Sequence, residues 1–269
     1  MSLVVVCSAK STGVTTAALG LAGTWPVGQP AALAELDPSG GDIASWYQLP
    51  HTPGLLSWAA AARDPRRPGG RLADHVRQLP GGVAAVLAPP SARAVTGALD
   101  LLFDVDPRPL SAAGRQAVVI GDCGRLDPYS PARPLLAGAD LVLIVARPRL
   151  ADVAHLGDWL PALPAEPGRV RLLLTGDGPY HPGEITAAVG VPVLGVLPHD
   201  PRGAAALAGA PSTRAPLWRL PLIAAAGRAA AVLARELDTL AAPPRQLRHP
   251  RTIGGLRLAV STVDGRGSR

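Results

Sequence analysis

The stretch Leu3-Val-Val-Val-Cys7-Ser-Ala-Lys10-Ser-Thr-Gly13-Val-Thr-Thr16 decides the fold class of this chain. An apolar run of strand length leads into a turn of small and hydroxyl residues, and an alanine-rich helical pattern follows the turn. A strand, a turn and a helix in this order form the setting of a phosphate-binding loop, in which main-chain amides at the start of a helix face an anion. Lys10 is the only lysine of the chain, so the one compact ammonium side chain lies in this turn. The arginines carry bulkier, forked guanidinium groups. The stretch therefore predicts a βα unit that binds phosphate.

The turn matches only part of the usual phosphate-loop pattern, G-x-x-x-x-G-K-[ST]. Gly13, Thr15 and Thr16 match, whereas Ser8 stands at the first glycine and Val14 stands at the lysine. In the usual loop, amides wrap the phosphates, the lysine reaches the terminal phosphates and the hydroxyl group holds magnesium. This loop keeps the turn and the hydroxyl group but lacks the main side-chain cation. A plain βα turn is the alternative, because short connections of this kind are common.

Two further apolar runs end in carboxylates. Residues 31–36 read as a strand that leads to Asp37, and residues 117–121 read as a strand that leads to Asp122. In a parallel sheet these carboxylates lie at the same edge as the loop, because ligands of open α/β sheets bind at the carboxyl ends of the strands. Either acid alone also fits an ordinary strand-end or turn residue. The three segments together favour one shared site.

The loop and the two carboxylates resemble the ParA/MinD family of P-loop NTPases, whose deviant Walker loop reads K-G-G-x-G-K-[ST]-[ST]. In that family an early signature lysine lies five residues before the second lysine and reaches the nucleotide of the partner subunit. Lys10 lies four residues before Val14. Lys10 is therefore either the signature lysine of a loop shortened by one residue or a replacement that swings into the pocket of the missing lysine. Asp37 lies in a segment similar to the family's D-x-D-P-x-G, and Asp122 ends a strand similar to its Walker B strand.

The resemblance implies a site for ATP and Mg²⁺ in a homodimer that clamps two nucleotides face to face. Thr15 would hold the magnesium ion, Asp122 would orient water bound to that ion, and Asp37 would orient the attacking water. Lys10 would neutralise phosphate charge within its own subunit or across the dimer. The residues expected to contact the nucleotide are Lys10, Ser11, Thr12, Gly13, Val14, Thr15, Thr16 and Pro198.

Downstream segments extend the resemblance over most of the chain. Residues 139–148 are similar to the family's strand after Walker B. Residues 190–200 are similar to its last core strand and to the loop beside the base, which contains Pro198. The strand at 170–174 leads to Asp177, where relatives that prefer adenine usually carry an asparagine. The identity of the base is therefore open.

Alternating strand and helix patterns predict an α/β fold with a doubly wound, mostly parallel sheet and helices on both faces. One domain over residues 1–241 suits the length of 269 residues and the hydrophobic content of 48%. A further strand is expected at 83–87. The expected helices cover residues 15–22, 54–62, 92–103, 132–136, 151–163 and 222–240 and a short segment after Pro182.

The net charge of +6 is concentrated at the carboxyl end. Residues 242–269 hold six arginines against one acid, Asp264, so the rest of the chain is nearly neutral. A nearly neutral body gives no compositional case for a DNA-coating face. We expect residues 242–269 to form a flexible basic tail that could bind DNA or an acidic partner. Partner docking through its apolar centre, 252–260, and membrane binding are the alternatives, and the double glycine in this centre disfavours a membrane-lying helix.

Cysteine usage and the absence of targeting signals indicate the compartment. Cys7 and Cys123 fall on predicted inner strands and form no metal or disulfide pattern, so both are expected to be buried thiols. The start of the chain lacks the charged segment and the long apolar run of a secretion signal. No apolar stretch approaches the roughly 20 residues that cross a bilayer. These features predict a cytoplasmic protein with no membrane span.

Two functional hypotheses follow. In the first, implied by the resemblance, the chain is a nucleotide-dependent dimerisation switch with impaired hydrolysis that works with a protein partner to position chromosome, plasmid, division, pilus or secretion machinery. In the second, the chain is a pseudo-ATPase, a scaffold or regulatory subunit with weak or no nucleotide binding. The retained carboxylates favour the first hypothesis, and Val14 in a shortened loop favours the second. A ligase similar to dethiobiotin synthetase or a metallochaperone would need substrate residues or a cysteine pair that the sequence lacks.

Overall fold

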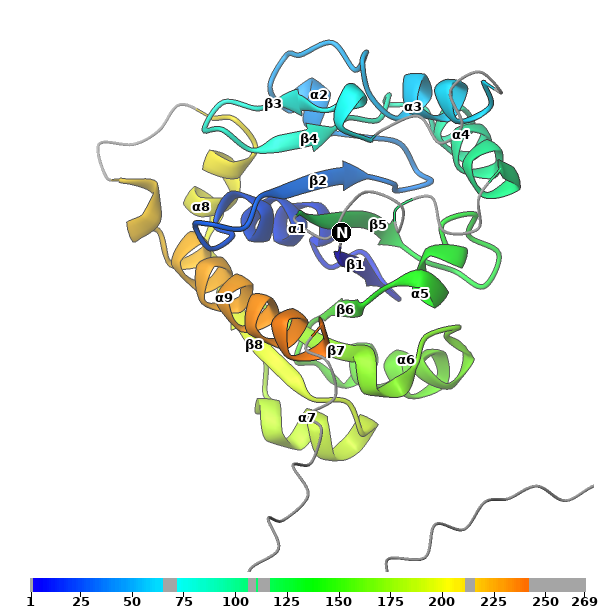
Figure 1. Cartoon of the computed structure of the whole chain (residues 1–269). Coiled ribbons are helices and arrows are strands. Elements are labelled where there is room, and N and C mark those ends of the chain that lie inside the picture. The colour runs from blue at the N-terminus through cyan, green and yellow to red at the C-terminus, as the bar shows by residue number, and fades with distance from the viewer. Residues whose placement is uncertain (1, 65–71, 106–109, 111–116, 211–215, 242–269) are drawn as a thin grey trace, which may run out of the picture.

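The computed structural model of the chain describes residues 2–64, 72–105, 110, 117–210 and 216–241, which form an eight-stranded sheet between two layers of helices (Figure 1). The strand order is β3-β4-β2-β5-β1-β6-β7-β8, and every pair is parallel except β3 with β4. The strands are β1 (Ser2–Ser8), β2 (Ala31–Glu35), β3 (Arg77–Gln78), β4 (Ala84–Val86), β5 (Val118–Arg125), β6 (Leu141–Ala146), β7 (Val170–Thr175) and β8 (Val193–Leu197).

Helices connect most of the parallel strands. The α-helices are α1 (Val14–Gly23), α2 (Ile43–Trp46), α3 (Leu55–Ala62), α4 (Ala92–Val105), α5 (Pro134–Gly138), α6 (Leu150–Trp159), α7 (Pro182–Val189), α8 (Pro201–Leu207) and α9 (Pro221–Ala241). Short 3₁₀ turns cover Leu72–His75, Leu160–Ala162, Pro167–Arg169 and Leu217–Arg219.

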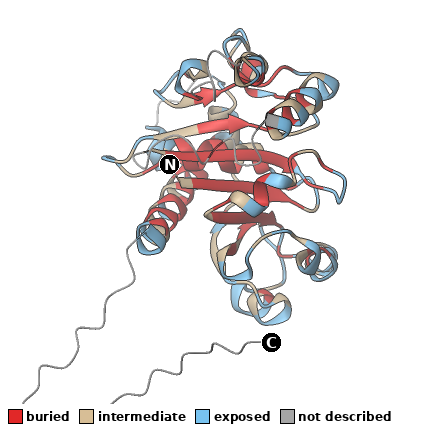
Figure 2. Cartoon of the chain, turned by 45° about the vertical axis from the view of Figure 1, so that its right-hand side comes forward, coloured by how far each residue is buried: buried red, intermediate tan, exposed pale blue. Residues whose placement is uncertain are grey.

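Two hydrophobic cores fill the spaces on the two faces of the sheet. Successive residues of a strand point to opposite faces, so Val4 and Val6 of β1 belong to one core and Leu3 and Val5 belong to the other. Helices α1, α2 and α9 cover the first core, and α3, α4, α5, α6 and α7 cover the second (Figure 1). The central strands are therefore buried from both sides (Figure 2), which is why they read as unbroken apolar runs.

Strand order brings distant parts of the sequence together at the carboxyl edge of the sheet. The first strand, β1, lies between β5 and β6, and β2 lies on the other side of β5. In the registers of these pairs, Asp122 of β5 lies level with Val6 of β1 and with Glu35 of β2. The loop after β1 and the acidic ends of β2 and β5 are thus neighbours.

The structure confirms the predicted α/β class and the parallel, doubly wound sheet. Each helix and strand expected from periodicity is present, with three main differences in extent. The helix expected at 132–136 covers Pro134–Gly138. The helix expected at 151–163 ends at Trp159 and continues as a 3₁₀ turn that contains Pro161, because proline cannot continue the α-helical hydrogen bonds. The strand that leads to Asp122 also continues to Arg125.

Three elements lie outside the sequence predictions. Helix α2 has four residues and β3 has two, so neither is long enough to show a hydrophobic period. Helix α8, seven residues rich in alanine, follows Asp200, whose side chain accepts a hydrogen bond from the amide of Gly203 and caps the helix. The predicted basic tail, 242–269, lies outside the described residues.

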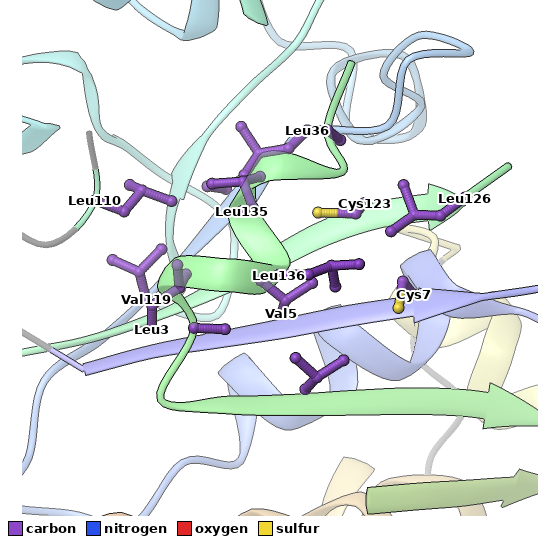
Figure 3. Close-up of a cluster of buried hydrophobic side chains, with 14 of the residues drawn as sticks. Leu3, Val5, Cys7, Leu36, Leu110, Val119, Cys123, Leu126, Leu135 and Leu136 are labelled. Carbon is purple, nitrogen blue, oxygen red and sulfur yellow. The ribbon is translucent and has the colours of Figure 1, made fainter. Parts of the chain in front are cut away.

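Both cysteines are buried free thiols, as predicted, and contribute to the core covered by α3 to α7 (Figure 3). Burial raises the pKa of the Cys7 and Cys123 thiols, so neither has the character of a reactive thiolate. Among the described residues, no helix is both long and apolar enough to span a bilayer.

Candidate functional site

The loop after β1 has the backbone of an anion-binding turn. Gly13 adopts a left-handed conformation, with φ of 87°, immediately before the first residue of α1, and this N-cap residue has no side chain that could bond to the amides of the helix. Those amides point toward the turn and carry the positive end of the helix dipole. A residue with a Cβ atom would be strained at Gly13, so the glycine of the motif is required by backbone geometry.

Hydrogen bonds fix the loop to the neighbouring strands. Thr12 Oγ1 donates to the carbonyl of Val145 at 2.9 Å, and Thr175 Oγ1 donates to the carbonyl of Thr12 at 3.2 Å. Arg147 Nη2 donates to the carbonyl of Ser11 at 2.8 Å. Because three bonds with β6, β7 and the residue after β6 converge on it, the loop is held in place before any ligand binds.

Val14 stands where the motif has its lysine, and Lys10 is the lysine that this loop does contain. The two side chains lie in different surroundings. Val14, at the usual lysine, is only 5% exposed and packs in the core beneath α1. Lys10 is exposed at the tip of the turn, where the Ser8 hydroxyl donates to its carbonyl group. In the described part of the chain, no carboxylate forms an ion pair with the Lys10 ammonium. The full charge of Lys10 is therefore available outside the loop.

A cluster of three carboxylates lies behind the loop. Asp122 is 1% exposed, its Oδ1 accepts from the amide of Gly124 at 3.1 Å, and its carboxylate is hydrogen-bonded to the Thr15 side chain. The Asp37 carboxylate lies directly over Gly124, where a methyl group would overlap it, and Gly124 has a positive φ of 56°. The carboxylates of Asp37, the predicted switch acid, and Asp122, the predicted Walker B acid, thus both lie next to Gly124.

The third carboxylate, Glu35, organises the segment that carries Asp37. It is 1% exposed, and its Oε1 accepts from the amides of Asp42 and Ile43, both at 2.9 Å. Its Oε2 accepts from the amide of Ala88 at 2.9 Å. One side chain therefore joins the start of α2 to the segment that follows β4, and the loop between Glu35 and Asp42 is fixed at both ends.

Burial raises the pKa of all three carboxyl groups. The pKa of Asp122 rises to about 7, because burial outweighs its hydrogen bonds with Thr15 and Gly124 and the charges of Asp37 and Glu35 add to the effect. Burial likewise raises the pKa of Asp37 and of Glu35. A cation beside these groups would lower the pKa values again.

The arrangement fits a magnesium ion that is shared with a ligand. Thr15 supplies a hydroxyl oxygen and Asp122 a carboxylate within hydrogen-bond reach of it. Among the described residues, no group of three or more acidic, histidine or cysteine side chains could hold a metal by itself. Magnesium commonly takes one or two protein oxygens and completes its octahedron with water and phosphate oxygens. The donors present match that pattern.

A cavity of about 490 Å³ opens next to the loop. Thr12, Gly13 and Thr16 line its loop end, so these predicted nucleotide contacts are brought together. Pro198, another predicted contact, follows β8 and also lines the cavity. The volume is in the range of small-molecule binding sites. The predicted contacts that do not line this cavity are Lys10, Ser11, Val14 and Thr15.

Two carboxylates, those of Asp177 and Asp200, also line the cavity, and they differ in their hydrogen-bond partners. Asp200 is engaged, because its Oδ1 accepts from Gly203 at 3.0 Å and its Oδ2 accepts from Leu222 at 3.2 Å. These bonds, with that from Gly203 first, lower the pKa of Asp200. Asp177 is exposed, and its carboxylate forms no hydrogen bond or ion pair with another described residue. Of these two carboxylates, only that of Asp177 remains available to a ligand.

Sequence reasoning missed two groups of this site. Glu35 reads as an interior strand residue, and only its three hydrogen bonds with distant amides reveal its position. Arg147 and Arg149 line the cavity, although no motif in the sequence points to either residue. The sequence does show that Arg147 is a cation directly after an inner strand. Only the strand order shows that this strand, β6, lies beside β1 and its loop.

Comparisons of the fold identify structural relatives. The crystal structure of a ParA family ATPase from Chlorobium tepidum TLS has a TM-score of 0.63 at 16% identity and covers 86% of this chain and 97% of its own. The septum site-determining protein MinD from Pyrococcus horikoshii OT3, complexed with Mg-ADP, has a TM-score of 0.63 at 17% identity. The match covers 89% of this chain and 98% of the MinD chain. An ATP complex of a variant of McdA from Cyanothece has a TM-score of 0.61 at 15% identity. The match covers 88% of this chain and 96% of the McdA chain.

Similarity is confined to the fold, because no family model and no curated protein gives a match to the sequence. The solved structures match over nearly their whole length. The resemblance predicted the parallel, doubly wound sheet, the glycine turn after the first strand and the acidic strand ends described above. The chain therefore has the fold of the ParA/MinD P-loop ATPases.

Proposed function

We propose that the chain is a nucleotide-dependent dimerisation switch that positions cellular cargo together with a protein partner. The observation that carries the proposal is the convergence of the phosphate loop, Asp37, Asp122 and the cavity at one edge of the sheet. The solved relatives support the ligand class, since one is a complex with Mg-ADP and another a complex with ATP. A MinC:MinD complex from Aquifex aeolicus supports the existence of protein partners among proteins of this fold.

The residues of the site have separate tasks in this proposal. The amides after Gly13 bind the phosphates. The Thr15 hydroxyl and Asp122 would hold a magnesium ion, and such an ion would supply positive charge beside the phosphate oxygens. Asp37 orients the attacking water, and Glu35 keeps Asp37 in position because it fixes both ends of the loop from Glu35 to Asp42 that carries Asp37. Phosphoryl transfer depends mainly on positioning and charge neutralisation. With Val14 at the lysine position, we expect slow hydrolysis.

The primary test is a titration of the full chain with magnesium and a non-hydrolysable ATP or GTP analogue, in parallel with light scattering. A switch predicts micromolar binding and a change from monomer to dimer. No heat and no change in mass would make the second candidate, a pseudo-ATPase scaffold, the better description. Val14 in the core is the observation that favours this second candidate.

Lys10 is expected to act across the dimer. Its side chain is exposed and does not line the cavity, so its charge is available to a second subunit facing the loop. Lys10→Ala should leave nucleotide affinity of the monomer within about twofold and weaken nucleotide-dependent dimerisation at least about tenfold, the effect of one lost charge-assisted contact. Analytical ultracentrifugation measures the dimer, with Arg228→Ala on the exposed face of α9 as the control. A drop in monomer affinity with normal dimerisation would place Lys10 in its own subunit's site instead.

Asp177 is expected to influence the choice of base. A carboxylate only accepts hydrogen bonds, and guanine presents two adjacent donors where adenine presents one donor beside an acceptor. Asp177→Asn should therefore shift the ratio of ATP to GTP affinity toward ATP by about tenfold, because an amide can serve both a donor and an acceptor. Competition binding measures the ratio, and Asp158→Asn on α6 is the matched control. An unchanged affinity ratio would show that Asp177 does not contact the base.

A further inference from the structure

We propose that Arg147 supplies the phosphate-binding charge that the loop lacks at Val14. This inference rests on the proposed nucleotide site and assigns a residue to one of its functions. Arg147 follows directly after β6, the strand beside β1, and Cys7 of β1 lies level with Ile144 of β6. The register places Arg147 alongside the start of the phosphate loop, although Arg147 and Ser11 are 136 positions apart in the sequence.

One hydrogen bond holds the guanidinium group on the loop. Arg147 Nη2 donates to the carbonyl of Ser11 at 2.8 Å, and Arg147 lines the cavity together with Thr12, Gly13 and Thr16. A guanidinium group has five N–H donors in one plane, so the bond to Ser11 leaves most of them for a ligand. The same geometry suits two parallel hydrogen bonds to a phosphate group.

No acidic side chain in the described segments neutralises the charge of Arg147. Its partner on Ser11 is a neutral carbonyl, and no carboxylate among the described residues forms an ion pair with Arg147. By contrast, Arg169 pairs with Glu166 and Arg171 pairs with Glu236. Arg147 is therefore anchored by the loop and retains a full positive charge at the cavity.

The other cations near the loop fit this role less well. Lys10 does not line the cavity, and Arg149 does, but the Arg149 side chain forms no hydrogen bond with a described residue that would hold it at the loop. Val14 is buried and carries no charge. Of the described cations, Arg147 alone combines contact with the loop and access to the cavity.

The test compares Arg147→Ala with the unaltered chain for AMP, ADP and a non-hydrolysable triphosphate, all with magnesium. Loss of the guanidinium group should reduce triphosphate affinity at least about tenfold and AMP affinity less than about twofold, because the missing charge acts on the outer phosphates. Arg147→Lys should recover part of the triphosphate affinity. Arg133→Ala is the matched control, since Arg133 also donates to a main-chain carbonyl, that of Ala162, but does not line the cavity.

The outcomes separate this inference from the proposed function. If the unaltered chain binds the triphosphate and Arg147→Ala binds it within twofold, the inference is wrong and the proposed site stands. If Arg147→Ala lowers the affinity for all three nucleotides by the same factor, Arg147 only fixes the loop and the inference is also wrong. If the unaltered chain binds none of the three nucleotides, the proposed function fails and the inference fails with it.

Discussion

Asp122→Asn is expected to stabilise the protein at neutral and alkaline pH while it abolishes magnesium-dependent nucleotide binding. Burial raises the pKa of Asp122 from 3.8 to about 7, so the folded protein favours the protonated acid more strongly than the unfolded chain does. Each pKa unit corresponds to about 1.4 kcal/mol of stability. The substitution should therefore raise the free energy of unfolding at pH 8 by about 4 kcal/mol.

The pH dependence of this effect has a definite sign. Well below pH 4 the carboxyl group is protonated in both states and contributes no pH dependence. Between pH 4 and pH 7 the folded state binds the additional proton, so stability of the unaltered protein falls as the pH rises. The advantage of Asp122→Asn should thus grow from about 1 to 2 kcal/mol at pH 5 to its full value at pH 8.

Two measurements check this prediction. Urea denaturation of both proteins at pH 5 and pH 8 gives the change in stability, and titration with and without magnesium gives the change in binding. The asparagine side chain can still accept from Gly124 and donate to Thr15, so the substitution preserves the shape of the site. A difference in stability that does not depend on pH would show that Asp122 is not the titrating group. Retained magnesium dependence would remove Asp122 from the metal site.

Glu35→Ala is expected to cause the largest loss of stability. The substitution leaves the amides of Asp42, Ile43 and Ala88 without an acceptor. The bonds to Ile43 and Ala88 are buried, and each buried unsatisfied amide costs about 1 to 3 kcal/mol. Burial raises the pKa of Glu35, so removal of the carboxylate also removes a desolvation cost that offsets part of this loss. The expected net decrease in the free energy of unfolding is about 3 kcal/mol or more.

Glu35→Gln is the matched variant for this measurement. Its amide oxygen can accept from Asp42 and Ile43, whereas its NH₂ group would face the amide of Ala88, which is another donor. We expect a loss of about 1 to 2 kcal/mol, intermediate between the glutamate and alanine proteins. Urea denaturation measures both variants. A loss below about 1 kcal/mol for Glu35→Ala would contradict the anchoring role assigned to this side chain.

Asp122 and Glu35 differ in whether the sequence alone could predict their place in the site. Asp122 could be predicted, because it ends an apolar strand and a carboxylate at that position has a known place in the motif. Glu35 could not, because its function depends on amides seven, eight and 53 residues away that only the folded chain brings to it. Asp37 was predicted as the switch acid, but its contact with Gly124 of a different strand follows from the sheet register.

By itself, the sequence determined the α/β class, the glycine turn between β1 and α1 and the acidic strand ends, because hydrophobic period and turn chemistry are properties of neighbouring residues. Tertiary structure alone decided that Val14 is buried, that Glu35 anchors the loop carrying Asp37, and that Arg147 lies on the phosphate loop. The physical reason is the parallel sheet, in which crossover connections place β6 and β5 on either side of β1. Neighbours at the carboxyl edge are therefore set by strand order, which no local pattern in the chain specifies.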